Sequence, residues 1–224
     1  MARRLAALLG CVLALGAAPA RARSSTTVDR VAVRFVTRET GGVSAPRFIF
    51  ERQLAFEARL EALAGGTSHE GDPPFRPRDL QAALERHVAE TVLESLDVQP
   101  PPRVAEVSRR MDQARIALIE RVGGLVPLTE AARAESIADS ELLRILRRQA
   151  LASLYLDRMV APMLEPSDAE IRGVHRTQRT PFSGQAFDEV EPALRRWYVG
   201  TRLGAALAAF YDGLRTRLVL TVLR

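Results

Sequence analysis

Histidine is the side chain best suited to metal binding or to proton transfer near neutral pH. The chain contains only His69, His87 and His175. They lie far apart in unrelated settings, so no pair has the spacing of a metal-binding or catalytic motif. We interpret His87 as a residue at the rim of the hydrophobic core, because it lies at the edge of an apolar helix face. The histidines therefore predict no catalytic residue and no metal site.

Three clustered carboxylates, Asp188, Glu189 and Glu191, are a second candidate for chemistry. They fall at the expected start of a helix, where the helix dipole stabilises negative charge, and they need no catalytic role there. The sequence has no G-x-S-x-G motif, phosphate-binding loop or dinucleotide fingerprint. These absences predict no cofactor and favour a binding or folding protein over an enzyme, without locating its peptide-binding residues.

Arginine and methionine side chains offer two further possibilities. A helix expected over 139–160 is apolar except for an arc of about 100° that carries arginines. These arginines are Arg144, Arg147, Arg148 and Arg158. We interpret them as a solvated face, with a site for acidic partners as the alternative. Met111, Met159 and Met163 fit packing in the core, or a flexible contact surface for varied partners.

The first 22 residues have the pattern of a secretory signal peptide. Arg3 and Arg4 precede an apolar run over 5–18, and two A-x-A cleavage patterns follow at 18–20 and 20–22. The run is shorter than the roughly 20 residues of a membrane-spanning helix, so an anchor is the less favoured alternative. We predict a signal peptide over 1–22 and a periplasmic domain over 23–224, without stable membrane insertion after cleavage.

Cleavage would change both the charge and the cysteine content. It would remove three arginines, which lowers the formal net charge of +5 by three, and it would remove Cys11, the single cysteine. A nearly neutral chain is a poor binder of nucleic acid, and we predict none. An exported chain without disulfides depends on packing alone, and about 200 residues are enough for one domain with a core.

The hydrophobic pattern predicts a mainly α fold with a small antiparallel sheet. Segment 30–36 alternates in the manner of a strand, 47–50 fits a returning strand, and 218–223 fits a strand at the other end of the chain. We expect these N-terminal and C-terminal strands to pair, because each alone leaves an exposed edge. Several helices are expected between these strands. The second and the third of these helices each carry an apolar stripe. The stripes consist of Leu80, Leu84, Val88 and Val92, and of Val104, Val107, Met111, Ala114, Leu118 and Val122.

Two closing helices are expected over 166–179 and 187–217. Ser167 and Glu170 fit a capping box at the start of the first. The second carries two stripes on nearly opposite faces, so it either bridges two parts of the domain or bends between them. The stripes are Phe187, Val190, Leu194, Trp197, Tyr198 and Thr201, and Leu203, Leu207, Phe210, Leu214 and Leu218. Gly200 and Gly204, with Ala208 continuing the line of small residues, predict the close approach of another helix.

This layout resembles the SurA-type periplasmic chaperones. Segment 146–172, with "PSDAEIR" at its end, resembles the end of the N-terminal module of that family, and 181–223 resembles the helix and strand that complete it. In the family a parvulin-type prolyl isomerase domain lies between these segments. Only 14 residues separate Arg172 from Phe187 here. A folded domain needs roughly 40 residues or more, so the isomerase is expected to be absent.

The resemblance implies an ATP-independent chaperone that holds unfolded envelope proteins, especially outer-membrane proteins, and lacks isomerase activity. Two alternatives stay open. One is a helical interaction protein of the envelope with a single dedicated partner. The other is a divergent peptidyl-prolyl isomerase, which the missing site residues disfavour.

Overall fold

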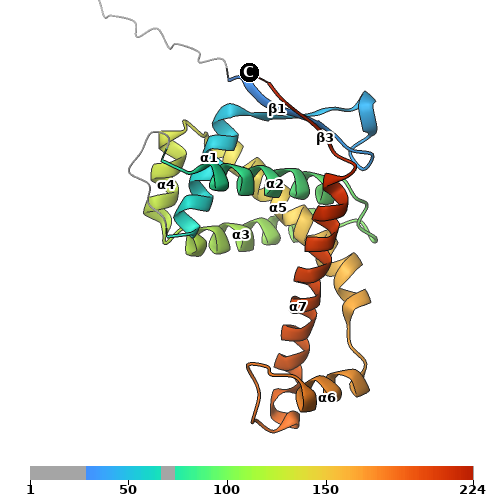
Figure 1. The fold of residues 1–224 in the computed structure, drawn as a ribbon. Coiled ribbons are helices and arrows are strands. Elements are labelled where there is room, and N and C mark those ends of the chain that lie inside the picture. Colours follow the sequence, from blue (N-terminus) through green and yellow to red (C-terminus); the bar gives the residue numbers. More distant parts are fainter. Residues whose placement is uncertain (1–28, 67–73, 224) are drawn as a thin grey trace, which may run out of the picture.

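A computed structural model describes residues 29–66 and 74–223. Figure 1 shows a helical body beneath a small sheet, and a long helix that leaves the body and carries a short helix at its far end. The elements are β1 (Val31–Val36), β2 (Arg47–Phe50), α1 (Glu51–Ala64), α2 (Pro77–Glu94), α3 (Val104–Arg121), α4 (Leu125–Ala134), α5 (Asp139–Tyr155), α6 (Asp168–Thr177), α7 (Phe187–Arg215) and β3 (Val219–Val222). A π-helical turn, Leu156–Val160, extends α5.

The sheet joins the two ends of the described chain. Its strand order is β2-β1-β3, and both pairs are antiparallel. Val33 lies opposite Val222, and Phe35 lies opposite Leu220. The expected mainly α fold, with a small sheet built from N-terminal and C-terminal strands, is therefore confirmed.

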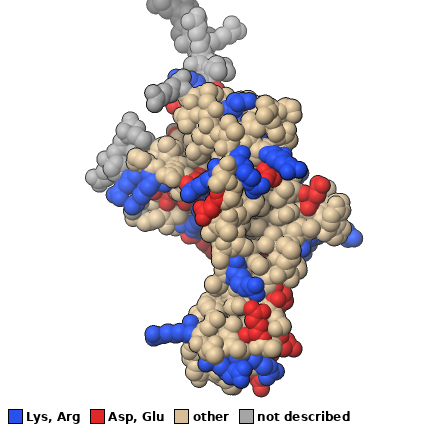
Figure 2. Space-filling view, turned by 45° about the vertical axis from the view of Figure 1, so that its right-hand side comes forward, with Lys and Arg blue, Asp and Glu red and all other residues tan. Residues whose placement is uncertain are grey.

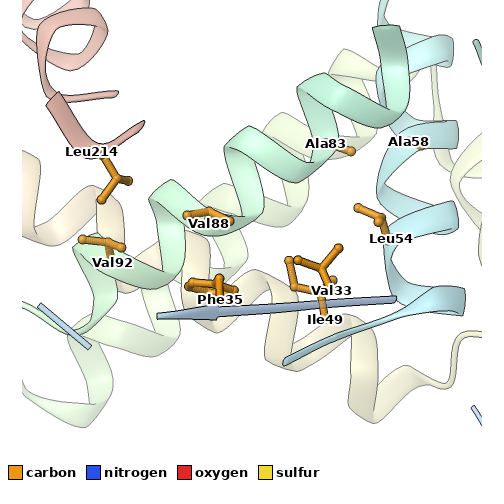
Figure 3. Packing of buried hydrophobic residues seen from close by; sticks show 9 residues of the cluster. All are labelled: Val33, Phe35, Ile49, Leu54, Ala58, Ala83, Val88, Val92 and Leu214. Carbon is orange, nitrogen blue, oxygen red and sulfur yellow. The ribbon is translucent and has the colours of Figure 1, made fainter. Parts of the chain in front are cut away.

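The first core lies between this sheet and the helices below it. Strand alternation puts Val33 and Phe35 on one face, where they pack with Val88 and Val92 of α2 (Figure 3). Leu214, near the end of α7, closes the same core. The C-terminal helix is thus fixed to the body one turn before the chain enters β3.

A second core joins α1, α3, α4 and α5. Its fully buried members include Phe56, Leu60 and Ile145. Most of the stripe predicted for α3 enters this core, but its first residue does not. Val104 is 88% exposed, because it begins the helix where the side chain projects beyond the neighbouring elements. The stripe is therefore a core face only from Val107 onward.

The distal lobe consists of α6, the connecting segment 178–186 and the first half of α7. Ile171, Val174 and Leu194 form its buried centre. Ser167 caps α6 as predicted, since its Oγ accepts a hydrogen bond from the Glu170 amide at 3.2 Å. The second half of the predicted capping box is replaced, because the Glu170 carboxylate accepts instead from the Tyr198 hydroxyl at 2.8 Å.

Of the two alternatives predicted for α7, bridging between two parts of the domain agrees with its packing. Its first stripe contributes to the centre of the distal lobe, and its second stripe packs on the body through Phe210 and Leu214. The predicted close approach at Gly200 and Gly204 is wrong. A Cβ at either glycine would meet nothing within 4 Å, and Ala208 is exposed. The middle of α7 crosses between two parts of the molecule without a helix packed on its glycines.

Candidate functional site

An apolar groove lies between the sheet and the helices. It has a volume of about 990 Å³ and is lined from β1, β3, α1, α2 and α4. A second hollow of about 230 Å³ shares Gln81 and Leu84 with it and follows α2 toward the end of α7. We refer to the two together as the sheet–helix groove. Its apolar lining includes Leu54, Phe75, Leu80, Leu84, Leu220 and Val222.

The groove exists because the helical layer covers the sheet unevenly. Residues that lie opposite each other in an antiparallel pair share a face, so Leu220 and Val222 face the same side as Phe35 and Val33. Phe35 and Val33 are 0% and 2% exposed, whereas Leu220 and Val222 are 36% and 63% exposed. The helices pack under β1 and leave the apolar underside of β3 accessible.

Charged side chains at the margins of the groove neutralise one another. The ion pairs are Arg30–Glu51, Arg52–Asp29, Arg59–Glu135 and Arg215–Glu85. Figure 2 likewise shows acidic and basic side chains lying next to each other over the body. The groove therefore offers an apolar floor with a nearly neutral rim, which suits an uncharged apolar segment better than a nucleotide or another anion.

A second candidate is a buried charged cluster that joins α1, α2 and α5. Arg148 donates from Nη2 to Glu57 at 2.9 Å and from Nε to Glu90 at 3.0 Å. His87 Nδ1 lies 3.1 Å from both Glu57 oxygens. Its Nε2 lies 3.5 Å from Arg148 Nη1, which can only donate. The imidazole of His87 therefore lies between the Glu57 carboxylate and the Arg148 guanidinium.

The cluster corrects two predictions from the sequence. Arg148 was expected on a solvated face, but it is buried, because its side of α5 packs against carboxylates on α1 and α2. Arg144 and Arg147 are exposed as expected. Arg158 is half-buried and pairs with Glu106, which lies on α3. His87 is buried inside the packed body, where its Nδ1 contacts Glu57, and not at the rim of the core as predicted.

Burial and charge shift the two carboxyl groups of the cluster in opposite directions. Burial alone favours the protonated form of Glu57, but electrostatic attraction to Arg148 and His87, together with hydrogen bonds from both, outweighs it and lowers the pKa to about 2. Burial raises the pKa of Glu90 to about 7, and the attraction of Arg148 only partly opposes this. Although burial favours the neutral guanidinium, Glu57 and Glu90 raise the pKa of Arg148.

Glu90 also reaches a groove of about 480 Å³ between α2, α3 and α5. A buried carboxyl group with a raised pKa beside a groove is a recognised sign of a functional site. Here its Oε2 is held by Arg148, and Glu57, His87 and Arg148 satisfy one another. We therefore interpret the cluster as a network that fixes three helices against each other.

The other residues singled out in the sequence are not brought together. His175 Nε2 lies 3.0 Å from the Gln185 carbonyl oxygen in the distal lobe, far from the cluster of His87, and His69 falls outside the described residues. Asp188 and Glu189 occupy the first turn of α7 as expected, and Glu191 accepts from Arg195. In residues 29–66 and 74–223, no group of three or more His, Cys, Asp or Glu is placed to hold a metal ion.

Two of the methionines differ in their burial. Met111 packs against the second core, as the core interpretation predicts. Met163 is 74% exposed in the turn before α6, so the core interpretation is wrong for it. The predicted signal peptide, 1–22, and Cys11 lie outside the described residues. Among the helices that the structure describes, none combines the length and apolar character needed to cross a membrane.

Sequence reasoning missed both candidate sites. Glu57 and His87 interrupt otherwise apolar helix faces, and this was the available signal for a buried pair. The groove left a weaker signal, namely apolar residues on both faces of the final strand. No protein-family model, curated protein or solved structure matches this chain, so the fold and the groove carry the functional argument.

Proposed function

We propose that the protein is an ATP-independent chaperone of the periplasm that holds unfolded envelope proteins and lacks prolyl isomerase activity. The observation that carries the proposal is the sheet–helix groove, an apolar hollow with a charge-neutral rim beside an open strand. Unfolded envelope proteins expose the apolar segments that such a groove can cover. The proposed export rests on the sequence of residues 1–22 alone.

The chemistry of the groove suits reversible holding. A chaperone that works without ATP must release its client, so its contacts must be individually weak and tolerant of different sequences. An open groove lined by aliphatic side chains provides contact through burial of apolar area, which is not directional. Because the rim charges already pair with one another, they leave no fixed charge to demand a particular partner.

The segment between α6 and α7 supports the absence of an isomerase domain. Only residues 178–186 connect these helices, and they close as a turn in which the Thr180 amide donates to Ser183 Oγ at 2.9 Å. A folded domain needs roughly 40 residues or more. A divergent isomerase would need its active site elsewhere, and an assay with a proline-containing peptide tests for it.

The proposal is tested by the aggregation of an unfolded outer-membrane barrel protein. The protein at comparable molarity should slow aggregation. Leu80→Asp should weaken this effect, because Leu80 lines the groove and is 36% exposed. Ile116→Asp is the matched control, since Ile116 is 57% exposed on α3 and lines none of the described grooves.

The outcomes separate the candidate functions. Suppression of aggregation for several unrelated clients, weakened only by Leu80→Asp, supports the general chaperone. Activity toward no client would favour a helical interaction protein with one dedicated partner. The distal lobe, which α7 carries away from the body (Figure 1), is the feature that favours this second candidate.

A further inference from the structure

The outer edge of β3 presents unpaired backbone groups. In the described part of the chain β3 pairs with β1 on one side, and no strand lies on its other side. The Leu223 amide donates to the Ala32 carbonyl at 2.9 Å. Because hydrogen bonding alternates along an antiparallel strand, Val219 and Thr221 also direct their backbone groups to β1. The N–H and C=O groups of Leu220 and Val222 therefore point outward.

The same two residues place their side chains over the sheet–helix groove. Leu220 lines the hollow beside α7, and Val222 lines the larger hollow beside α1. Residues two apart in a strand are separated by about 6.6–6.8 Å, so the two side chains form a short apolar row. The edge thus combines outward hydrogen-bonding groups with an apolar surface directly below them.

This combination selects an extended, uncharged segment with alternating apolar residues. A row of N–H and C=O groups can be satisfied in register only by another extended backbone. Apolar side chains at every second position would enter the groove, whose floor includes Leu80 and Leu84 of α2. The paired rim charges provide no counter-ion for a charged side chain there.

The opposite edge of the sheet is less suited to pairing. The register of β2 against β1 is interrupted between Val31 and Val33, and β2 runs directly into α1. Both edge strands have four residues, but the extra residue Ala32 in β1 disturbs the pairing where β2 meets the helix. The regular edge is therefore the one beside the groove.

We propose that an extended client segment binds as a fourth strand on β3, antiparallel to it, with its backbone paired to Leu220 and Val222 and its apolar side chains in the sheet–helix groove. This inference rests on the proposed chaperone function and names the class of segment held. Such segments, in which apolar and polar residues alternate, are the strands of unfolded β-sheet proteins.

Alternate N-methylation of a peptide tests the proposal. A fluorescent peptide of alternating valine and threonine is titrated with the protein, alongside two versions that are N-methylated at three valines or at three threonines. If the peptide pairs antiparallel to β3, the residues that lie opposite Leu220 and Val222 face the groove and also direct their N–H groups to β3. The valines are expected to occupy these positions. Methylation at valine should weaken binding at least about tenfold, which corresponds to the loss of one to three hydrogen bonds. Methylation at threonine should leave it nearly unchanged.

The two methylated peptides carry the same number of added methyl groups, so they control for general effects on solubility and conformation. If only methylation at threonine weakened binding, the peptide would pair parallel to β3, and the antiparallel arrangement would be overturned. Equal loss, or no loss, in both peptides would overturn strand addition altogether. Aggregation could still be suppressed in that case, so the chaperone function and the mode of binding fail separately.

A substitution in β3 provides an independent measurement. Val222→Pro removes one outward N–H without removing a donor to β1, whereas Val222→Ala removes side-chain contact and keeps the N–H. The proline variant should bind the unmodified peptide several-fold more weakly than the alanine variant.

Sedimentation without peptide shows whether a second copy of the protein occupies the edge of β3 instead. A dimer abolished by Val222→Pro would overturn the proposal, because a second copy would then occupy the edge. If the proline variant does not fold, the methylated peptides decide alone.

Discussion

In the body, side chains from α1 to α5 and the sheet enclose two apolar cores, whereas the buried centre of the distal lobe consists of Ile171, Val174 and Leu194. The aromatic side chains that surround this smaller centre are only partly buried. Since stability from burial grows with the apolar area removed from water, the two regions contribute unequally. The body is expected to unfold last, and the distal lobe can open locally before it.

The two regions also differ in where they place charge. The body buries Glu57 and Arg148 together, and each group depends on its partner because water cannot replace it. In the distal lobe, the pairs of Arg195 with Asp168 and of Arg202 with Glu170 lie at the surface, where such pairs contribute about 0–1 kcal/mol. A charge change should therefore matter far more in the body than in the lobe.

The largest effect is expected for Arg148→Ala. This change leaves Glu57 as a buried carboxylate beside His87 and removes the hydrogen bond to Glu90, so the free energy of unfolding should fall by about 3–5 kcal/mol. Urea denaturation followed by circular dichroism measures it. Arg147→Ala, one position earlier on the exposed side of α5, should change the same quantity by less than about 0.5 kcal/mol. If both substitutions lowered the free energy of unfolding equally, the buried contacts of Arg148 would contribute no more to stability than the exposed side chain of Arg147.

Leu194→Ala should destabilise the distal lobe and spare the body. Leu194 is fully buried, and loss of such a side chain costs about 2–5 kcal/mol where the structure cannot collapse. Amide hydrogen exchange should show faster exchange in α6 and the first half of α7, with unchanged protection in α1 and α2. If protection fell in all of these helices together, the lobe and the body would form one cooperative unit.

The stability of the body should depend on pH in two directions. The pKa of Glu90 rises from 4.5 to about 7 on folding, so the folded state holds an extra proton and stability falls as pH rises through this window, by up to about 3 kcal/mol. The pKa of Glu57 falls from 4.5 to about 2, so stability is also lost as pH drops below 4.5. The melting temperature should therefore be highest near pH 5.

Glu90→Gln sharpens this prediction, because glutamine keeps the neutral form at every pH. In the variant, the melting temperature should fall much less above pH 5 than it does in the unmodified protein. It should still fall at acidic pH, where Glu57 becomes protonated. The other groups facing Glu90 are Arg148, Glu57, Arg86 and Tyr211. Burial also raises the pKa of Glu61, which adds a smaller slope of the same sign that the variant should retain. If the variant showed the same dependence of melting temperature on pH, a group other than Glu90 would cause the decrease.

The smallest effect is expected in the helix that joins the two regions. Gly204→Ala should raise stability by about 0.5–1 kcal/mol, because alanine is the better helix former and the added Cβ meets nothing within 4 Å. Differential scanning calorimetry should detect a slightly higher melting temperature. Gly124→Ala is the contrasting control, since Gly124 has φ +132 and a side chain there is strained, so the melting temperature should fall.

The sequence by itself determined the elements whose signals are local. Alternation fixed the strands at both ends of the chain, and the serine at 167 fixed the start of α6, because pleat period and capping depend on neighbouring residues only. The two opposite stripes of α7 likewise predicted that it packs in two places, and it does.

Only the tertiary structure decided what each face meets. Helical periodicity grouped Arg148 with Arg144 and Arg147, but it carries no information on the carboxylates of α1 and α2 that bury the first of them. For the same reason, the sequence led to a wrong prediction of a helix contact at Gly204 and gave no prediction of the unpaired edge of β3. Burial, a pKa shift and a free strand edge are properties of segments far apart in the chain, and they exist only once packing has brought those segments together.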